Sequence, residues 1–176
     1  MRPALLFVIG ASGAGKTAAT ETLQARALPG VHCYYFDTIG VPSAEVMQRD
    51  FGGGEQWQAA TTARWIDRLV AEPESRPLAV LEGQTRPSFI KPALDRVGVR
   101  HARIILLDAQ PDVRAARLRG QRPELASPRM DAWAAYLRGQ ADALGLPIVD
   151  TTHISIEAVA DALEREMEVL RAEAAV

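Results

Sequence analysis

The residues from Gly10 to Thr17, Gly-Ala-Ser-Gly-Ala-Gly-Lys-Thr, are the part of the chain whose types and spacing most directly suggest chemistry. They fit the pattern G-x-x-x-x-G-K-[ST], in which a glycine-rich turn directs backbone N–H groups at phosphate oxygens. The helix expected next adds the positive end of its dipole. Lys16 would neutralise the β and γ phosphates, and Thr17 would offer its hydroxyl to Mg²⁺, which prefers oxygen ligands. The residues predicted to hold a nucleotide here are Gly10, Ser12, Gly13, Ala14, Gly15, Lys16 and Thr17.

A phosphate-binding loop indicates a nucleotide but does not say which reaction follows. Kinases, switch-type GTPases and ATPase modules of larger machines all use one. A GTPase is expected to carry Asn-Lys-x-Asp after a later strand, and neither residues 107–110 nor residues 150–153 have that sequence. An ATPase module normally needs a longer chain with an additional helical domain. A kinase is therefore favoured, and a nucleotide-binding regulator or an ATPase with little turnover stays open as the alternative.

Two carboxylates directly follow apolar segments. Glu82 comes after residues 78–81, and Asp37 comes after residues 32–36. In open α/β sheets, ligands bind at the carboxyl ends of the strands. We therefore expect Glu82 and Asp37 to lie at the same edge of a sheet as the phosphate-binding loop.

The elements that would position these residues follow from hydrophobic periodicity. Short, nearly continuous apolar runs predict strands buried on both faces of a parallel sheet. Segments with apolar residues three or four positions apart predict amphipathic helices, the last beginning after an N-cap at Ser155. The alternation of the two predicts an α/β fold of three layers, with a five-stranded parallel sheet flanked by helices. The predicted strands are 4–9, 32–36, 78–81, 102–107 and 147–149, and the predicted helices are 17–27, 88–97, 111–119, 130–144 and 156–170.

Residues 38–77 form the one long interval that breaks this alternation. Within it, residues 43–49 and 55–71 have a helical pattern on either side of three consecutive glycines, 52–54. Such insertions commonly carry substrate contacts. We expect a helical, substrate-binding insertion in a single domain spanning residues 1–176, since a domain is usually about 100 to 200 residues long.

The composition excludes several classes of partner. The net charge of −2 lacks the basic surface that nucleic-acid binding requires, so no nucleic-acid partner is expected. No apolar run approaches the roughly 18 residues of a membrane-spanning helix, so no membrane association is expected. The single cysteine, Cys33, cannot form an internal disulfide; it is expected to be a small buried residue in a cytoplasmic protein.

Several segments resemble adenylate kinase and other nucleoside monophosphate kinases of the P-loop kinase superfamily. Residues 82–87, Glu-Gly-Gln-Thr-Arg-Pro, resemble the Asp-Gly-x-Pro-Arg segment of that family, residues 117–122 its Arg-Leu-x-x-Arg turn, and residues 129–131 the Arg-x-Asp of its lid. The resemblance implies ATP and Mg²⁺ as ligands and a short lid at 120–130. It also implies that Glu82 organises Mg²⁺, that Arg86 holds phosphate, and that Thr152 belongs to the adenine-side loop. Arg117, Arg122 and Arg129 would contact the nucleotide or close over the transferred phosphate.

The segment after the second predicted strand is different. Adenylate kinases carry Thr-Gly-Asp-x-Leu-Arg there, whereas this chain has Phe-Asp-Thr-Ile-Gly at 36–40. An aspartate at that place resembles shikimate kinase and chloramphenicol phosphotransferase, which implies that Asp37 faces an accepting hydroxyl. Arg49 in the insertion is a further candidate, for an anionic acceptor. The partners expected are ATP and a small molecule with a hydroxyl, or alternatively a nucleoside monophosphate; the oligomeric state is left open.

Overall fold

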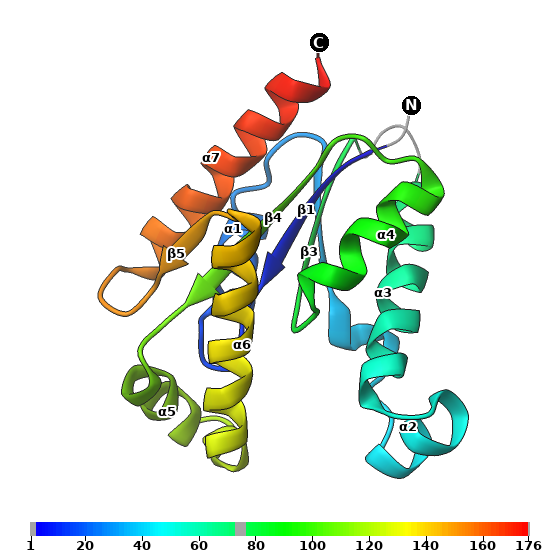
Figure 1. Ribbon diagram of the computed structural model, residues 1–176. Coiled ribbons are helices and arrows are strands. Elements are labelled where there is room, and N and C mark those ends of the chain that lie inside the picture. The colour runs from blue at the N-terminus through cyan, green and yellow to red at the C-terminus, as the bar shows by residue number, and fades with distance from the viewer. Residues whose placement is uncertain (1–2, 73–76, 176) are drawn as a thin grey trace.

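The computed structural model describes residues 3–72 and 77–175 (Figure 1). Within this part, five strands form one sheet in the order β2-β3-β1-β4-β5, and every neighbouring pair is parallel. The strands are β1 Ala4–Ile9, β2 Val31–Tyr35, β3 Leu78–Gly83, β4 Ala102–Asp108 and β5 Ile148–Asp150. The predicted five-stranded parallel sheet is therefore confirmed.

Helices cover both faces of this sheet and complete the predicted three-layer α/β architecture. One face packs against α1 and α7, and the other packs against α3, α4 and α6 (Figure 1). The helices are α1 Lys16–Ala25, α2 Ala44–Phe51, α3 Gly54–Val70, α4 Pro87–Val97, α5 Pro111–Arg119, α6 Pro128–Leu144 and α7 Ile156–Ala174, with short 3-10 turns η1 Phe36–Ile39 and η2 Pro123–Leu125.

The burial of the central strand β1 explains why an uninterrupted apolar run predicts a strand here. All six of its residues are buried. Leu6 and Val8 contribute to the core beneath α1 and α7, whereas Leu5 and Phe7 contribute to the core beneath α3, α4 and α6. A strand covered on both faces has no solvent-facing position, so it shows no polar alternation.

The second strand ends earlier than predicted. It stops at Tyr35, and Phe36 begins the 3-10 turn η1 instead of continuing the strand. The cause is tertiary packing: Trp65 of α3 donates a hydrogen bond from Nε1 to the Phe36 carbonyl at 3.0 Å, and Trp57 meets the Phe36 ring edge-on at 6.1 Å between centroids. Asp37 therefore lies on a turn that α3 holds in place, two residues after the end of the strand.

Gly83, at the end of β3, is a second requirement for this turn. A Cβ atom at residue 83 would overlap the Cβ of Phe36. We expect Gly83→Ala to destabilise the fold by about 1–3 kcal/mol, the usual cost of inserting atoms into a packed site, and to displace η1 with Asp37. Chemical denaturation measures the effect. The matched control is Gly139→Ala in the interior of α6, where a Cβ meets nothing within 4 Å; it should be neutral or stabilising by about 0.5–1 kcal/mol. Equal stabilities of the two variants would contradict this account.

The interval 38–77 contains the two expected helices, α2 and α3, although residues 73–76 lie outside the described residues. Ser43 caps the start of α2 by accepting a hydrogen bond from the Val46 amide, and Gly52, which has φ 85°, caps its end after Phe51. Cys33 corrects the expectation of a buried thiol, because it is half-buried on the edge strand β2; partial burial raises its pKa to about 11. No helix in the described part of the chain has the length and apolar character needed to cross a membrane.

Candidate active site

The phosphate-binding loop lies between β1 and α1, as the sequence predicted. Gly13 has φ 82°, and a Cβ there would be 2.8 Å from the carbonyl oxygen of Arg114 on α5, so only glycine fits. Lys16 begins α1 with only 7% of its surface exposed, and its Nζ donates to the Ala11 carbonyl at 3.0 Å. The ammonium group is thus folded back over the loop. Phosphate oxygens bound there would accept hydrogen bonds from it in place of, or in addition to, the Ala11 carbonyl.

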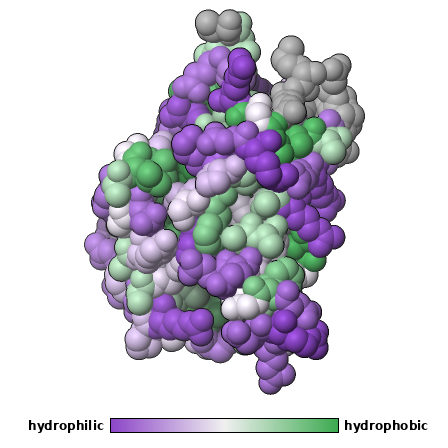
Figure 2. Space-filling view, turned by 45° about the vertical axis from the view of Figure 1, so that its right-hand side comes forward, coloured by the Kyte–Doolittle hydropathy of each residue, from purple (hydrophilic) through white to green (hydrophobic). Residues whose placement is uncertain are grey.

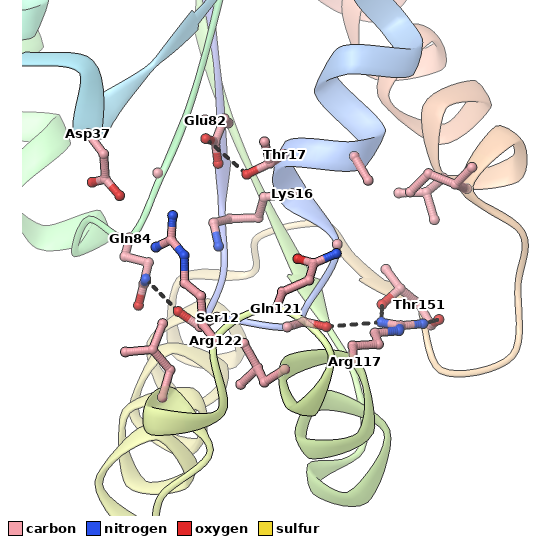
Figure 3. Close-up of a pocket in the computed structure, with 18 of the residues that line it drawn as sticks. Ser12, Lys16, Thr17, Asp37, Glu82, Gln84, Arg117, Gln121, Arg122 and Thr151 are labelled. Atoms are coloured by element: carbon pink, nitrogen blue, oxygen red, sulfur yellow. Dashed lines mark hydrogen bonds between the residues drawn. The ribbon is translucent and has the colours of Figure 1, made fainter.

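A cavity of about 520 Å³ opens beside this loop at the carboxyl edge of the sheet (Figure 3). It is bounded by the loop and α1, by η1 and the end of β3, by the C-terminal part of α5 with the segment after it, and by the loop between β5 and α7. The predicted residues that line it are Ser12, Gly13, Gly15, Lys16, Thr17, Asp37, Glu82, Arg117 and Arg122.

Thr17 and Glu82 form the candidate metal site. Thr17 Oγ1 donates to Glu82 Oε1 at 3.3 Å, and both side chains face the cavity beside Lys16 (Figure 3). Burial raises the pKa of Glu82, because the charged carboxylate loses solvation, while Lys16 acts in the opposite direction. A hydroxyl and a carboxylate oxygen side by side, with a desolvated negative charge, fit the oxygen ligands and the charge that Mg²⁺ requires.

This electrostatic balance makes a prediction about pH. Because its pKa is raised, folded Glu82 holds its proton more tightly than the unfolded chain does, so its contribution to stability falls as the pH rises above the ordinary pKa of 4.5. We expect Glu82→Gln to raise the Tm of the nucleotide-free protein at neutral pH and to reduce this decline. Glutamine keeps an oxygen that accepts from Thr17. Thermal unfolding of both proteins from about pH 4.5 upward is the measurement; a variant that is less stable at neutral pH, with an unchanged pH dependence, would refute it.

Asp37 and Arg117 lie on opposite sides of the cavity, with Lys16 between them (Figure 3). Asp37 is exposed at the cavity, and it raises the pKa of Lys16, though less than Glu82 does; burial, the largest influence, lowers that pKa. Arg122 extends into the cavity from the segment after α5 and also lowers the pKa of Lys16 (Figure 3). The carboxylates of Glu82 and Asp37 and the cations of Lys16 and Arg122 therefore converge on the same part of the cavity.

Arg117 connects the phosphate-binding loop to the loop after β5. Its guanidinium donates to the Gly13 carbonyl at 3.1 Å, to Thr151 Oγ1 at 3.0 Å and to the Thr151 carbonyl at 2.7 Å. Thr151 Oγ1 in turn donates to the Ala14 carbonyl at 2.9 Å. The neighbouring part of the cavity is apolar, with Ile154 and Ile156 in its lining, and this surface suits a nucleotide base.

The remaining predicted residues do not line the cavity. Arg49 is exposed on α2, where its Nε donates to Asp50 at 2.6 Å. Arg129 is exposed in the first turn of α6, within the predicted lid interval 120–130, which consists of η2, short connecting residues and the start of α6. Thr152 Oγ1 accepts from the Gln110 amide at 3.0 Å, next to Thr151, the residue that does reach the cavity. Arg86 lies among α3, α4 and α6. Of the loop residues, Gly10 and Ala14 are buried and contribute backbone only.

Three lining residues with polar side chains were not identified from the sequence: Gln84, Gln121 and Thr151. Gln84 Nε2 donates to Ser12 Oγ at 2.9 Å, so it joins the segment after β3 to the phosphate-binding loop. Its place two residues after the strand-end carboxylate was the available signal. Gln121 immediately precedes Arg122, and Thr151 immediately precedes Thr152. In each case the family resemblance points to the neighbouring residue, Arg122 or Thr152, instead.

No known protein-family model and no curated protein matches the sequence. Solved structures do match over nearly the whole chain. A gluconokinase from Sinorhizobium meliloti 1021 superposes with a TM-score of 0.62 at 17% identity, covering 96% of this chain and 94% of that one. The chain has a P-loop kinase-like fold.

Two further structures extend the comparison. Shikimate kinase from Acinetobacter baumannii, solved in complex with shikimate, matches with a TM-score of 0.61 at 14% identity, covering 97% of this chain and 94% of the other. Deoxyadenosine kinase from M. mycoides, solved with bound dATP, matches with a TM-score of 0.57 at 10% identity, covering 93% and 99%. These three structures, which share the fold of this chain, are thus small-molecule kinases with different acceptors.

Proposed function

We propose that this protein transfers the γ-phosphoryl group of ATP to a hydroxyl group of a small molecule. The observation that carries the proposal is the convergence of Lys16, the Thr17–Glu82 pair, Asp37 and Arg122 on one cavity at the carboxyl edge of the sheet. The P-loop kinase-like fold supports it, because the similar structures are kinases of small molecules.

Phosphoryl transfer needs positioning and charge neutralisation more than covalent chemistry. In the proposed reaction the loop amides and Lys16 hold the β and γ phosphates, and Arg122 neutralises charge that develops on the transferred group. Arg117 and the apolar surface near Ile156 hold the base. Thr17 and Glu82 would hold Mg²⁺, which when bound supplies further positive charge at the phosphate oxygens. Asp37 orients the acceptor hydroxyl and takes its proton.

The exposed carboxylate of Asp37 favours a hydroxyl over a phosphate as the acceptor. A phosphate monoester is already largely ionised near neutral pH, with a second pKa of about 6, so it needs no base. An alcohol does not ionise in this range and gains from a carboxylate in hydrogen-bond reach. A nucleoside monophosphate is therefore the second candidate acceptor.

The deciding experiment measures ADP release from Mg·ATP against a panel of sugars, sugar acids, other hydroxyl metabolites, antibiotics and nucleoside monophosphates. We expect at least one hydroxyl compound to stimulate ADP release and to become phosphorylated. Stimulation only by monophosphates would favour the second candidate. Tight ATP binding with no stimulated turnover would favour the nucleotide-binding regulator instead.

A further inference from the structure

Arg86, directly before α4, takes part in a chain of hydrogen bonds that reaches the phosphate-binding loop. Its Nη1 donates to Gln58 Oε1 of α3 at 2.7 Å. The other end of the same amide, Gln58 Nε2, donates to the Gln84 carbonyl, and the Gln84 side chain donates to Ser12 Oγ at 2.9 Å. Arg86 Nη2 lies 3.5 Å from Glu55 Oε2, in the first turn of α3.

The Arg86 guanidinium lies over three aromatic rings. Its central carbon lies 4.9 Å from the ring centroid of Trp133, 5.4 Å from that of Phe89 and 5.6 Å from that of Tyr136. Trp133 and Tyr136 stack on each other at 5.5 Å and an interplanar angle of 16°. Both belong to α6, whose first residues form the end of the predicted lid. Only 20% of the Arg86 side chain is exposed.

Arg86 therefore joins three elements that the sheet alone does not hold together. The polar contacts fix it to the beginning of α3, and the aromatic contacts fix it to α4 and α6. These helices cover one face of the sheet, and the space-filling view of that side shows a hollow in its lower half, toward the carboxyl edge of the sheet (Figure 2). The chain of hydrogen bonds ends at Gln84 and Ser12, which line the cavity, so the contacts of Arg86 link these helices to the wall of the site.

The same contacts make Arg86 a poor ligand for a phosphate. An arginine that binds phosphate presents parallel N–H groups to two oxygens. Here one terminal nitrogen is bonded to Gln58, the other faces the Glu55 carboxylate, and aromatic rings lie above the guanidinium. A phosphate dianion that approached Arg86 Nη2 would be repelled by the Glu55 carboxylate, which already lies 3.5 Å from that nitrogen. The phosphate role that the family resemblance implied is therefore not the one these contacts favour.

We propose that Arg86 is a positioning residue: together with Gln58 it ties α3 and α6 to the phosphate-binding loop and so sets the acceptor hydroxyl in line with the γ-phosphate. This inference rests on the proposed kinase function. A misplacement of about 1 Å in such an arrangement can reduce the rate about 10²-fold. Loss of the tie would also let water reach the γ-phosphate, so ATP would be hydrolysed without phosphorylation of the acceptor.

A double-mutant cycle of Gln58→Met and Arg86→Met tests this proposal. We expect each substitution to lower kcat for transfer by about 10-fold to 100-fold, with KM for ATP nearly unchanged and the ratio of phosphate released to acceptor phosphorylated raised. The two effects should not multiply, because both substitutions break the same tie. Arg86→Lys keeps the positive charge over the rings but not the hydrogen-bond geometry of the guanidinium. It should restore part of the coupling between ATP cleavage and phosphorylation of the acceptor. Thermal unfolding of each variant establishes that it is folded.

The matched control is Arg96→Met. Arg96 also joins α4 to α3, through Asp67 at 2.6 Å, but this pair is half-exposed on the surface and lies two to three helical turns further along both helices, at about 3.6 residues per turn. It should leave kcat and coupling unchanged. Multiplicative effects in the cycle, or an Arg86→Met variant that raises only the KM for the acceptor, would overturn the proposal and make Arg86 a direct acceptor ligand.

The failure of the proposed kinase function would look different. In that case the wild-type protein phosphorylates no acceptor in the panel. Amide hydrogen exchange at residues 83–86 then tests the tie without turnover: Gln58→Met should raise exchange there and Arg96→Met should not. Equal exchange in both variants would show that no tie exists.

Discussion

Lys16→Ala is expected to lower kcat/KM for ADP formation by about 10² to 10³, the usual cost of removing one preorganised group that stabilises transition-state charge. Lys16 is buried beside the loop, and its Nζ donates to the Ala11 carbonyl, so the substitution removes charge from the cavity without opening the apolar core. Burial lowers the pKa of Lys16, which means that the folded protein bears a cost for its charge. The Tm of the nucleotide-free variant should therefore be close to that of wild type.

Thermal shift with ATP measures the binding part of this prediction. Ligand that binds only the folded state raises Tm according to its affinity, so ATP should raise the Tm of wild type more than that of the variant. Lys91→Ala is the control, since Lys91 is an exposed lysine on α4 paired with Asp95. If ATP stabilises Lys16→Ala and wild type equally, the assignment of the phosphate-binding loop fails.

The fold could be predicted because its signals are local. The run 4–9 is apolar throughout because β1 is buried on both faces, and the helices show the three-or-four spacing of a single buried stripe. The end of β2 could not be predicted in this way. Whether Phe36 continues the strand or begins a turn depends on Trp65 and Gly83, which lie far away in the sequence.

The residues of the candidate site also fall into those with a local sequence signal and those that depend on distant residues. The sequence places Glu82 and Asp37 at one edge of the sheet because parallel strands bring their carboxyl ends together there, and the structure shows both lining the same cavity. Arg86 was assigned to phosphate because its place after Glu82 resembles a family segment. Its surroundings depend on Trp133 and Tyr136, two residues one helical turn apart on α6, and no spacing near Arg86 predicts them.

Asp37→Asn is expected to lower kcat with the true acceptor by about 10² or more, while ATP binding and Tm stay close to wild type. The amide can still accept a hydrogen bond from the acceptor hydroxyl, but it cannot take the proton. Asp37 is exposed at the cavity on the turn that Trp65 holds through Phe36, so its charge contributes to the reaction more than to folding. Steady-state kinetics with the acceptor found in the panel, together with the Tm shift produced by ATP, measure the two parts separately.

Two controls identify the role of the Asp37 carboxylate. Asp50→Asn, on the exposed surface of α2, likewise removes one carboxylate, from the insertion that follows Asp37, and should leave kcat unchanged. Glu82→Gln should instead raise the Mg²⁺ concentration needed for half-maximal activity, because Glu82 pairs with Thr17 at the candidate metal site. A base and a metal-organising carboxylate are therefore separable by their Mg²⁺ dependence. If Asp37→Asn keeps full activity and only nucleoside monophosphates stimulate ADP release, Asp37 is not a base. The acceptor would then be a phosphate that is already ionised, which needs no base.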